Sequence, residues 1–192
     1  MLNIFSRRTY AKPATWKIPV LCYHSWTVQT SDYAGNDHIA LQADLKTLAR
    51  RGYAILPATR LAAVLANQRN AFELNGRKLA CITFDDGIDL DWHTRPADNG
   101  EPQKSFAQIL REAKIKRYGK GPLATSFVIA SASARNQLDS RAWRGQNEWN
   151  HDWWAQAAKE NIIGIANHSW DHVHEQLDQV RQRDNRKGSF LD

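Results

Sequence analysis

The sequence has little cysteine and no long apolar run, and its first residues lack the pattern of an export signal. Two cysteines in 192 residues are too few for a disulfide scaffold or a zinc ribbon. Cys22 and Cys81 lie in apolar runs, so we interpret both as small buried residues. No apolar stretch reaches the roughly 18–20 residues that a membrane span needs. Residues 1–8 carry charges without a following apolar segment, so we expect no signal peptide and a cytoplasmic location.

The chain is basic, but its positive charge is scattered. Lysine and arginine number 26 against 20 aspartate and glutamate residues, a net charge of +6. No basic stripe with interleaved aromatic residues is present, so we expect no nucleic-acid partner. The eight tryptophans are more unusual, because five of them fall between positions 143 and 170. Tryptophan faces stack on sugar rings, but core packing is their commoner role.

Short apolar runs alternate with helical periodicity, which predicts an α/β fold with a mostly parallel sheet. The expected strands are 18–24, 53–56, 79–84, 124–130 and 162–166. The expected helices are 39–51, a helix with Leu61, Val64 and Leu65 on one face, an amphipathic helix over 106–113, and 152–160. In such folds the chemistry gathers in the loops that follow the strands.

Polar residues follow the third and fifth expected strands. Asp85 and Asp86 leave an apolar strand side by side, which is costly unless they serve a cation or a reaction. An Asp-Asp-Gly segment is also often only a turn. His168 and His172 would share one face if their segment were helical, and could then hold one metal ion. One carboxylate and two imidazoles would leave the other aspartate as a general base, although spacing alone does not say which.

Four motifs give the chain a resemblance to a known family. They are VLCYH at 20–24, TFDDG at 83–87, ATSFV at 124–128 and HSWDH at 168–172. In order and register they resemble the successive strands of the polysaccharide deacetylases, carbohydrate esterase family four, also called the NodB-homology domain. The resemblance implies a distorted (β/α) barrel and metal-dependent removal of N-acetyl or O-acetyl groups from carbohydrate.

The same resemblance assigns roles to the residues of these motifs. It makes Asp85 the catalytic base, and Asp86, His168 and His172 the ligands of one divalent metal ion, usually zinc. Trp170, between the two histidines, and His24, after the first strand, are candidates for binding the acetylated sugar.

The end of the chain departs from the family pattern. After position 174 there is no apolar strand, no Pro-Tyr pair and no later histidine to act as general acid. We therefore expect an incomplete barrel at 18–180, with an N-terminal extension at 1–17 and a loose basic tail at 181–192. A fragment, a prematurely ended reading frame and a chain completed by another subunit are all open. An unclosed sheet edge predicts poor solubility or self-association.

The connection at 88–103 is also longer than in the family, and we expect it to cover the metal site as a lid. His93, Asp89 or Asp91 could replace a missing group there, although an ordinary polar loop is the favoured interpretation.

Three hypotheses follow from these patterns. The first is a deacetylase of acetylated carbohydrate. The second is a non-catalytic remnant that binds sugar or metal, and the third is a metal-dependent hydrolase of a non-sugar amide or ester.

Overall fold

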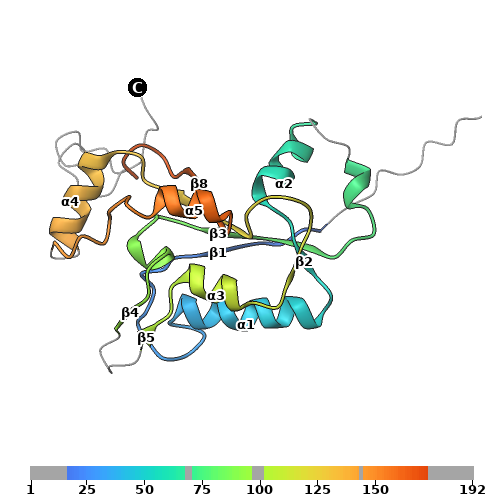
Figure 1. The fold of residues 1–192 in the computed structure, drawn as a ribbon, viewed down its shortest axis with the longest axis horizontal. Coiled ribbons are helices and arrows are strands. Elements are labelled where there is room, and N and C mark those ends of the chain that lie inside the picture. Colours follow the sequence, from blue (N-terminus) through green and yellow to red (C-terminus); the bar gives the residue numbers. More distant parts are fainter. Residues whose placement is uncertain (1–16, 68–70, 97–101, 143–144, 173–192) are drawn as a thin grey trace, which may run out of the picture.

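The computed structural model describes residues 17–67, 71–96, 102–142 and 145–172. Its central feature is a six-stranded sheet with parallel pairings (Figure 1). The strands are ordered β6–β2–β3–β7–β8, and β1 also pairs with β3. Their bounds are β1 (Val20–Tyr23), β2 (Ala54–Ile55), β3 (Leu79–Phe84), β6 (Lys116–Arg117), β7 (Ala124–Val128) and β8 (Ile163–Asn167). A separate antiparallel pair joins β4 (Arg95–Pro96) to β5 (Pro102–Gln103).

Helices pack on both faces of this sheet. They are α1 (Asp37–Arg50), α2 (Ala58–Leu65), α3 (Phe106–Glu112), α4 (Ala132–Ala142) and α5 (Trp154–Glu160), with short 3₁₀ turns η1 (Ala71–Leu74) and η2 (Asp89–Asp91). Figure 1 shows α1 and α3 together on one side of the strands and α2 on the other. No helix in the described ranges is both long and apolar enough to span a membrane.

Strand β3 lies at the centre of the sheet, and all six of its side chains are buried. Ile82 and Phe84 belong to the core cluster shared with α1 and α3, whereas Leu79 and Cys81 belong to the cluster shared with α2 and η1. Side chains of a strand alternate between faces, so a strand covered on both sides is apolar throughout. This explains the continuous apolar run at 79–84.

Three aromatic rings fix the position of β3 against the helices. The Phe84 and Phe106 ring centroids are 4.3 Å apart, and Tyr23 meets both rings edge-on at 6.5 and 6.3 Å. Full burial of one such side chain contributes about 1.5–3 kcal/mol. The contact therefore joins β1, β3 and α3 into one unit beneath the ends of the strands.

The parallel register brings the ends of three strands to one edge of the sheet. Phe84 of β3 is level with Ser126 of β7, and Val128 of β7 is level with Asn167 of β8. The segments that follow β3 and β8 therefore leave the sheet at the same end, as the sequence predicts.

All five predicted strands are confirmed, with ends that differ by a few residues, and the four predicted helices correspond to α1, α2, α3 and α5. Two burial predictions are wrong. Leu65 is 72% exposed, because α2 buries only the side of the helix that carries Val64. Cys22 is exposed on β1, although Cys81 is fully buried as predicted.

Several elements were not predicted from the sequence. Helix α4 buries Ala134 and Leu138 but has little apolar periodicity, and β4, β5 and β6 have two residues each. The tail at 181–192, nearly all of the extension at 1–17 and the end of the 18–180 domain lie outside the described residues, so the domain boundaries stay predictions.

The chain turns sharply after β3. Asp86 and Gly87 both have positive φ, 75° and 76°. A Cβ on Gly87 would lie 2.3 Å from Val128 Cγ1, so the turn also presses against β7. Glycine avoids both the conformational strain and the steric clash at this point.

We expect Gly87→Ala to destabilise the protein more than Gly52→Ala does. Gly52 has the same φ of 76°, but a Cβ there meets nothing within 4 Å. The left-handed conformation costs about 1–2 kcal/mol in both variants, and the clash with Val128 adds about 1–3 kcal/mol in Gly87→Ala alone. Urea unfolding of the two variants measures the difference, and equal losses would contradict the tight packing of this turn.

Candidate metal centre

Three side chains that could bind a metal converge where β3 and β8 end. They are Asp86, His168 and His172, and their ligand atoms all lie within 4.8 Å of one another. The Asp86 Oδ1 atom is 3.6 Å from His168 Nε2 and 3.5 Å from His172 Nε2. Asp86 is only 7% exposed, whereas the histidine side chains are 25% and 40% exposed. The cluster therefore has a buried carboxylate at its base and an open side towards solvent.

This arrangement fits a divalent metal ion. Two imidazole nitrogens and one carboxylate oxygen are a donor set that zinc uses in hydrolytic sites. Ligand atoms at about 2.0–2.2 Å from one tetrahedral ion are separated by about 3.3–3.6 Å, close to the distances between Asp86 Oδ1 and the two histidines. With three protein ligands, further coordination positions would be left for water or substrate.

The histidines meet through a turn and not through the helix that their spacing suggested. Ser169 and His172 have positive φ, 68° and 61°, and the His172 backbone N–H donates to Ser169 Oγ at 3.0 Å. The carbonyl oxygens of Ser169 and Trp170 accept from Ala130 and Ser131. Those carbonyls are therefore not available for helical hydrogen bonds within the segment. The two imidazole rings still lie 4.9 Å apart.

Asp85 stands beside the cluster and is not one of its three members. Its backbone N–H donates to the Tyr23 carbonyl at 3.1 Å, which continues the pairing of β1 with β3. Its side chain is half-buried. The two adjacent aspartates thus have different surroundings, since only Asp86 lies within ligand distance of both histidines.

Trp26 was missed by the sequence reasoning, although it contacts the cluster directly. Its indole Nε1 donates to Asp86 Oδ2 at 2.8 Å. The His24 ring packs edge-on against Trp26, with 5.7 Å between centroids, so His24 lies next to the site as expected. A tryptophan is neither a metal ligand nor an acid or base, and its position three residues after β1 gave no signal.

The other described tryptophans differ in exposure, and Trp154 is half-buried. Trp149 and Trp153 are buried, which excludes them as open platforms for a sugar, and Trp143 lies outside the described residues. Trp170 is 57% exposed and lies between the two histidines. It is therefore the tryptophan of this group best placed to contact a substrate.

The segment that follows Gly87 is part of the core and does not form a lid. Ile88, Leu90 and Trp92 are buried hydrophobic residues. Asp89 and Asp91 are buried as well. The expectation of a lid is therefore wrong for 88–92, because all five of these residues are buried.

Asp91 is fully buried beneath the candidate ligands. Ser25 Oγ donates to one carboxylate oxygen at 2.5 Å and Ser126 Oγ to the other at 2.6 Å. Burial raises the pKa of Asp91 to about 7; the two serine hydrogen bonds oppose this rise and the charges of Asp86 and Asp85 add to it. The carboxyl group ties the segments after β1 and β3 to β7.

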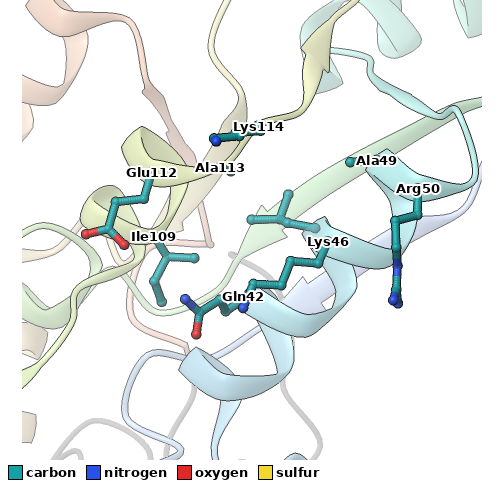
Figure 2. Close-up of a pocket in the computed structure, with 9 residues that line it drawn as sticks. Gln42, Lys46, Ala49, Arg50, Ile109, Glu112, Ala113 and Lys114 are labelled. Carbon is teal, nitrogen blue, oxygen red and sulfur yellow. The ribbon is translucent and has the colours of Figure 1, made fainter.

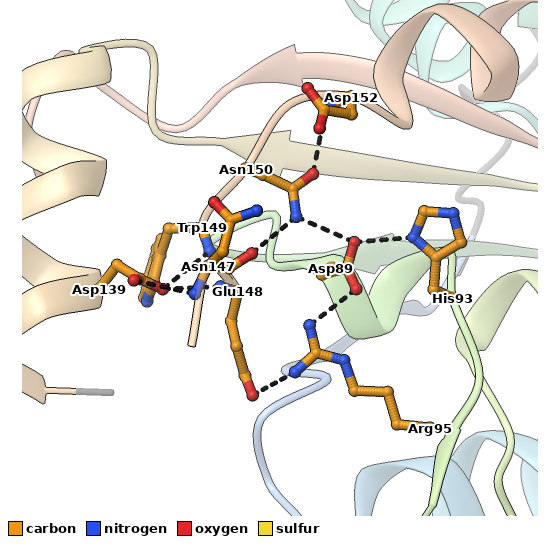
Figure 3. Close-up of polar contacts among 9 residues, drawn as sticks. All are labelled: Asp89, His93, Arg95, Asp139, Asn147, Glu148, Trp149, Asn150 and Asp152. Atoms are coloured by element: carbon orange, nitrogen blue, oxygen red, sulfur yellow. Dashed lines mark hydrogen bonds and ion pairs between the residues drawn. The ribbon is translucent and has the colours of Figure 1, made fainter. Parts of the chain in front are cut away.

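Asp89 belongs to a second polar network, which is separate from the contacts of Asp91 (Figure 3). It accepts from Arg95 at 2.8 Å and Asn150 at 3.1 Å, and its Oδ1 lies 2.7 Å from His93 Nδ1. Arg95 also pairs with Glu148. Burial would raise the pKa of Asp89, but the bonds from His93, Arg95 and Asn150 lower it below its ordinary value. The network fastens residues 89–95 to 148–150, which supports a structural interpretation of these polar residues.

A separate hollow of about 440 Å³ lies between α1 and α3 (Figure 2). Its lining includes the apolar residues Leu45 and Ile109 and three basic residues, Lys46, Arg50 and Lys114. None of the three candidate ligands lines it.

Comparisons with known proteins agree with the predicted fold. No family model matches the sequence, and no curated protein matches it significantly. The Streptococcus pyogenes deacetylase PplD, solved in complex with acetate, is similar in structure with a TM-score of 0.51 and 20% identity, over 88% of this chain and 64% of that chain. A polysaccharide deacetylase from Bacillus cereus is similar with a TM-score of 0.48 and 17% identity, over 89% of this chain and 47% of that chain.

The likeness to PplD is one of fold. The chain shares an α/β fold with a mostly parallel sheet with this deacetylase, which confirms the fold class expected from the sequence. It spans less than two thirds of the length of either similar structure.

We expect Asp91→Asn to change how stability depends on pH. With its pKa raised to about 7, Asp91 holds a proton in the folded state that the unfolded chain releases near pH 4. Its contribution is therefore present below about pH 4 and is lost as the pH rises to about 7. Relative to wild type, the variant should gain on the order of 4 kcal/mol across this range.

Urea unfolding at several pH values, in the presence of a chelator, measures this difference. The variant Asp152→Asn, at an exposed position, is the control. Parallel curves for Asp91→Asn and wild type would show that folding does not raise the pKa of Asp91.

Proposed function

We propose that this protein is a metal-dependent hydrolase that removes N-acetyl or O-acetyl groups from a carbohydrate. The observation that carries the proposal is the convergence of Asp86, His168 and His172 at the carboxyl end of a parallel sheet with a polysaccharide deacetylase fold. Two of the four sequence motifs contain these residues, Asp86 in TFDDG and both histidines in HSWDH. The acetate in the PplD structure is consistent with this class of reaction.

In this proposal Asp86 Oδ1, His168 Nε2 and His172 Nε2 hold one divalent ion, with zinc as our choice. When bound, such an ion polarises an acyl carbonyl and lowers the pKa of a coordinated water towards about 7. The side of the cluster on which the two histidines lie is the one exposed to solvent, so substrate would approach from there.

Asp85 takes the proton of the attacking water at its carboxylate, and this proton passes to the departing amine nitrogen or alcohol oxygen as its bond to the acetyl carbon breaks. It follows the same strand as Asp86, yet it is not one of the three ligands of the cluster, and the Cys22 thiol is a hydrogen-bond partner of its carboxylate. Trp170 offers an exposed ring for the face of a sugar, and His24 borders the same site through Trp26. These groups would orient the acetyl carbonyl towards the histidine side of the cluster.

We expect His168→Ala/His172→Ala to lose metal binding that the wild type possesses. Removing two of three ligands leaves one carboxylate, which cannot hold zinc tightly. Elemental analysis after dialysis should give about one zinc per wild-type chain and close to none in the double variant. His151 is an exposed histidine outside the cluster, so the control variant His151→Ala should still bind about one zinc per chain. A wild type without metal would refute the proposed function.

We expect Asp85→Asn to retain zinc and to lower the rate of acetate release by about 10²–10⁴-fold, because a general base is removed while the ligands remain. Acetate released from acetylated chitooligosaccharides is the measure, with Asp152→Asn as an exposed control.

The substrate panel for this assay decides between the three hypotheses. Bound zinc with no turnover of any glycan would favour a non-catalytic remnant. Turnover of simple amides or esters, with none of glycans, would favour a different hydrolase.

A further inference from the structure

We infer that Trp26 is a positioning residue that makes Asp86 a one-oxygen ligand of the metal centre; this inference rests on the proposed function. The two carboxylate oxygens of Asp86 have different partners. Oδ2 accepts the Trp26 indole N–H at 2.8 Å, while Oδ1 faces both histidine nitrogens, at 3.5 and 3.6 Å. The carboxylate is thereby turned so that one oxygen serves the metal and the other is held by the protein.

An indole N–H suits this task for chemical reasons. It is a donor only, so it cannot bind the metal itself or compete for the ligand position. A carboxylate with both oxygens free can bind a cation through one oxygen or through both, but the hydrogen bond to Oδ2 opposes the second mode. Because Asp86 is 7% exposed, little water is available to replace the indole N–H.

The rest of Trp26 is held rigidly enough to fix this hydrogen bond. Its ring packs against the cluster that contains Ile88 and Leu90. The neighbouring Ser25 is fully buried and bonds to Asp91 at 2.5 Å, and the Thr27 backbone bonds to His24 and Asp37. Trp26 is therefore anchored by the residue on each side as well as by its own contacts.

Hydrogen-bond partners of metal ligands commonly contribute 10–100-fold to metal affinity. Trp26→Phe keeps the aromatic body and removes only the N–H, so we expect zinc affinity to fall by about 10–100-fold. Competition against a chromogenic chelator of known affinity measures this. Trp154→Phe is the matched control, because its ring lies outside the ligand cluster, and it should bind zinc as the wild type does.

Trp26 could also support zinc binding only by stabilising the surrounding structure. A second measurement therefore reports whether Asp86 binds the metal through one oxygen or two. Co²⁺ is substituted for zinc, and its visible absorption is recorded for wild type and Trp26→Phe. We expect the variant to show weaker bands, because two-oxygen binding by Asp86 raises the coordination number. Thermal unfolding in the presence of a chelator checks that the metal-free variant is folded.

The outcomes separate this inference from the proposed function. Zinc binding by the wild type with unchanged affinity and cobalt spectrum in Trp26→Phe would overturn the inference and leave the proposed function standing. A wild type that binds neither zinc nor cobalt would overturn both.

If Trp26→Phe does not fold, the indole N–H resonance of Trp26 in the zinc-loaded wild type gives the answer. We expect slow exchange of this proton with solvent. Fast exchange would show that the hydrogen bond is absent and would overturn the inference.

Discussion

The parallel pairing of β3, β7 and β8 is the constraint on which the rest of the site depends. Phe84 is level with Ser126, and Val128 is level with Asn167, so the segments that follow β3 and β8 leave the same end of the sheet on either side of β7. Asp86 and the histidine pair are more than 80 residues apart in sequence, yet they need only short turns to meet. Any loss of this register would separate the carboxylate from the imidazoles.

Two unusual backbone turns complete what the sheet begins. Asp86 and Gly87 take positive φ after β3, and Ser169 and His172 do so after β8. Such conformations cost free energy at residues other than glycine, and they persist where the surroundings fix them. Here the surroundings are identifiable: Gly87 fits against Val128, and the histidine turn bonds to Ala130 and Ser131. Both turns thus pack against β7 and the residues that directly follow it.

The sequence predicts the fold well where burial governs it. The apolar runs at 79–84, 124–130 and 162–166 correspond to β3, β7 and β8, and the run at 79–84 is the strand that is buried at every position. Helix α4 escaped prediction because its sequence is mainly polar and only two of its apolar side chains pack inward.

The ligand residues were predicted from their chemistry and motif, and the structure brings the three of them together. The local conformation of the two histidines was not predicted, since their i, i+4 spacing fits a turn as well as a helix. Trp26 and Asp91 were beyond sequence reasoning, because their roles come from contacts across the sheet.

The most direct test of the account is X-ray absorption spectroscopy of the zinc-loaded protein at the zinc edge. The account predicts nitrogen and oxygen ligands at about 2.0–2.2 Å, with outer-shell scattering from two imidazoles and no sulfur. Sulfur at about 2.3 Å, as a cysteine thiolate would give, or the absence of imidazole scattering would contradict a metal centre built from Asp86, His168 and His172.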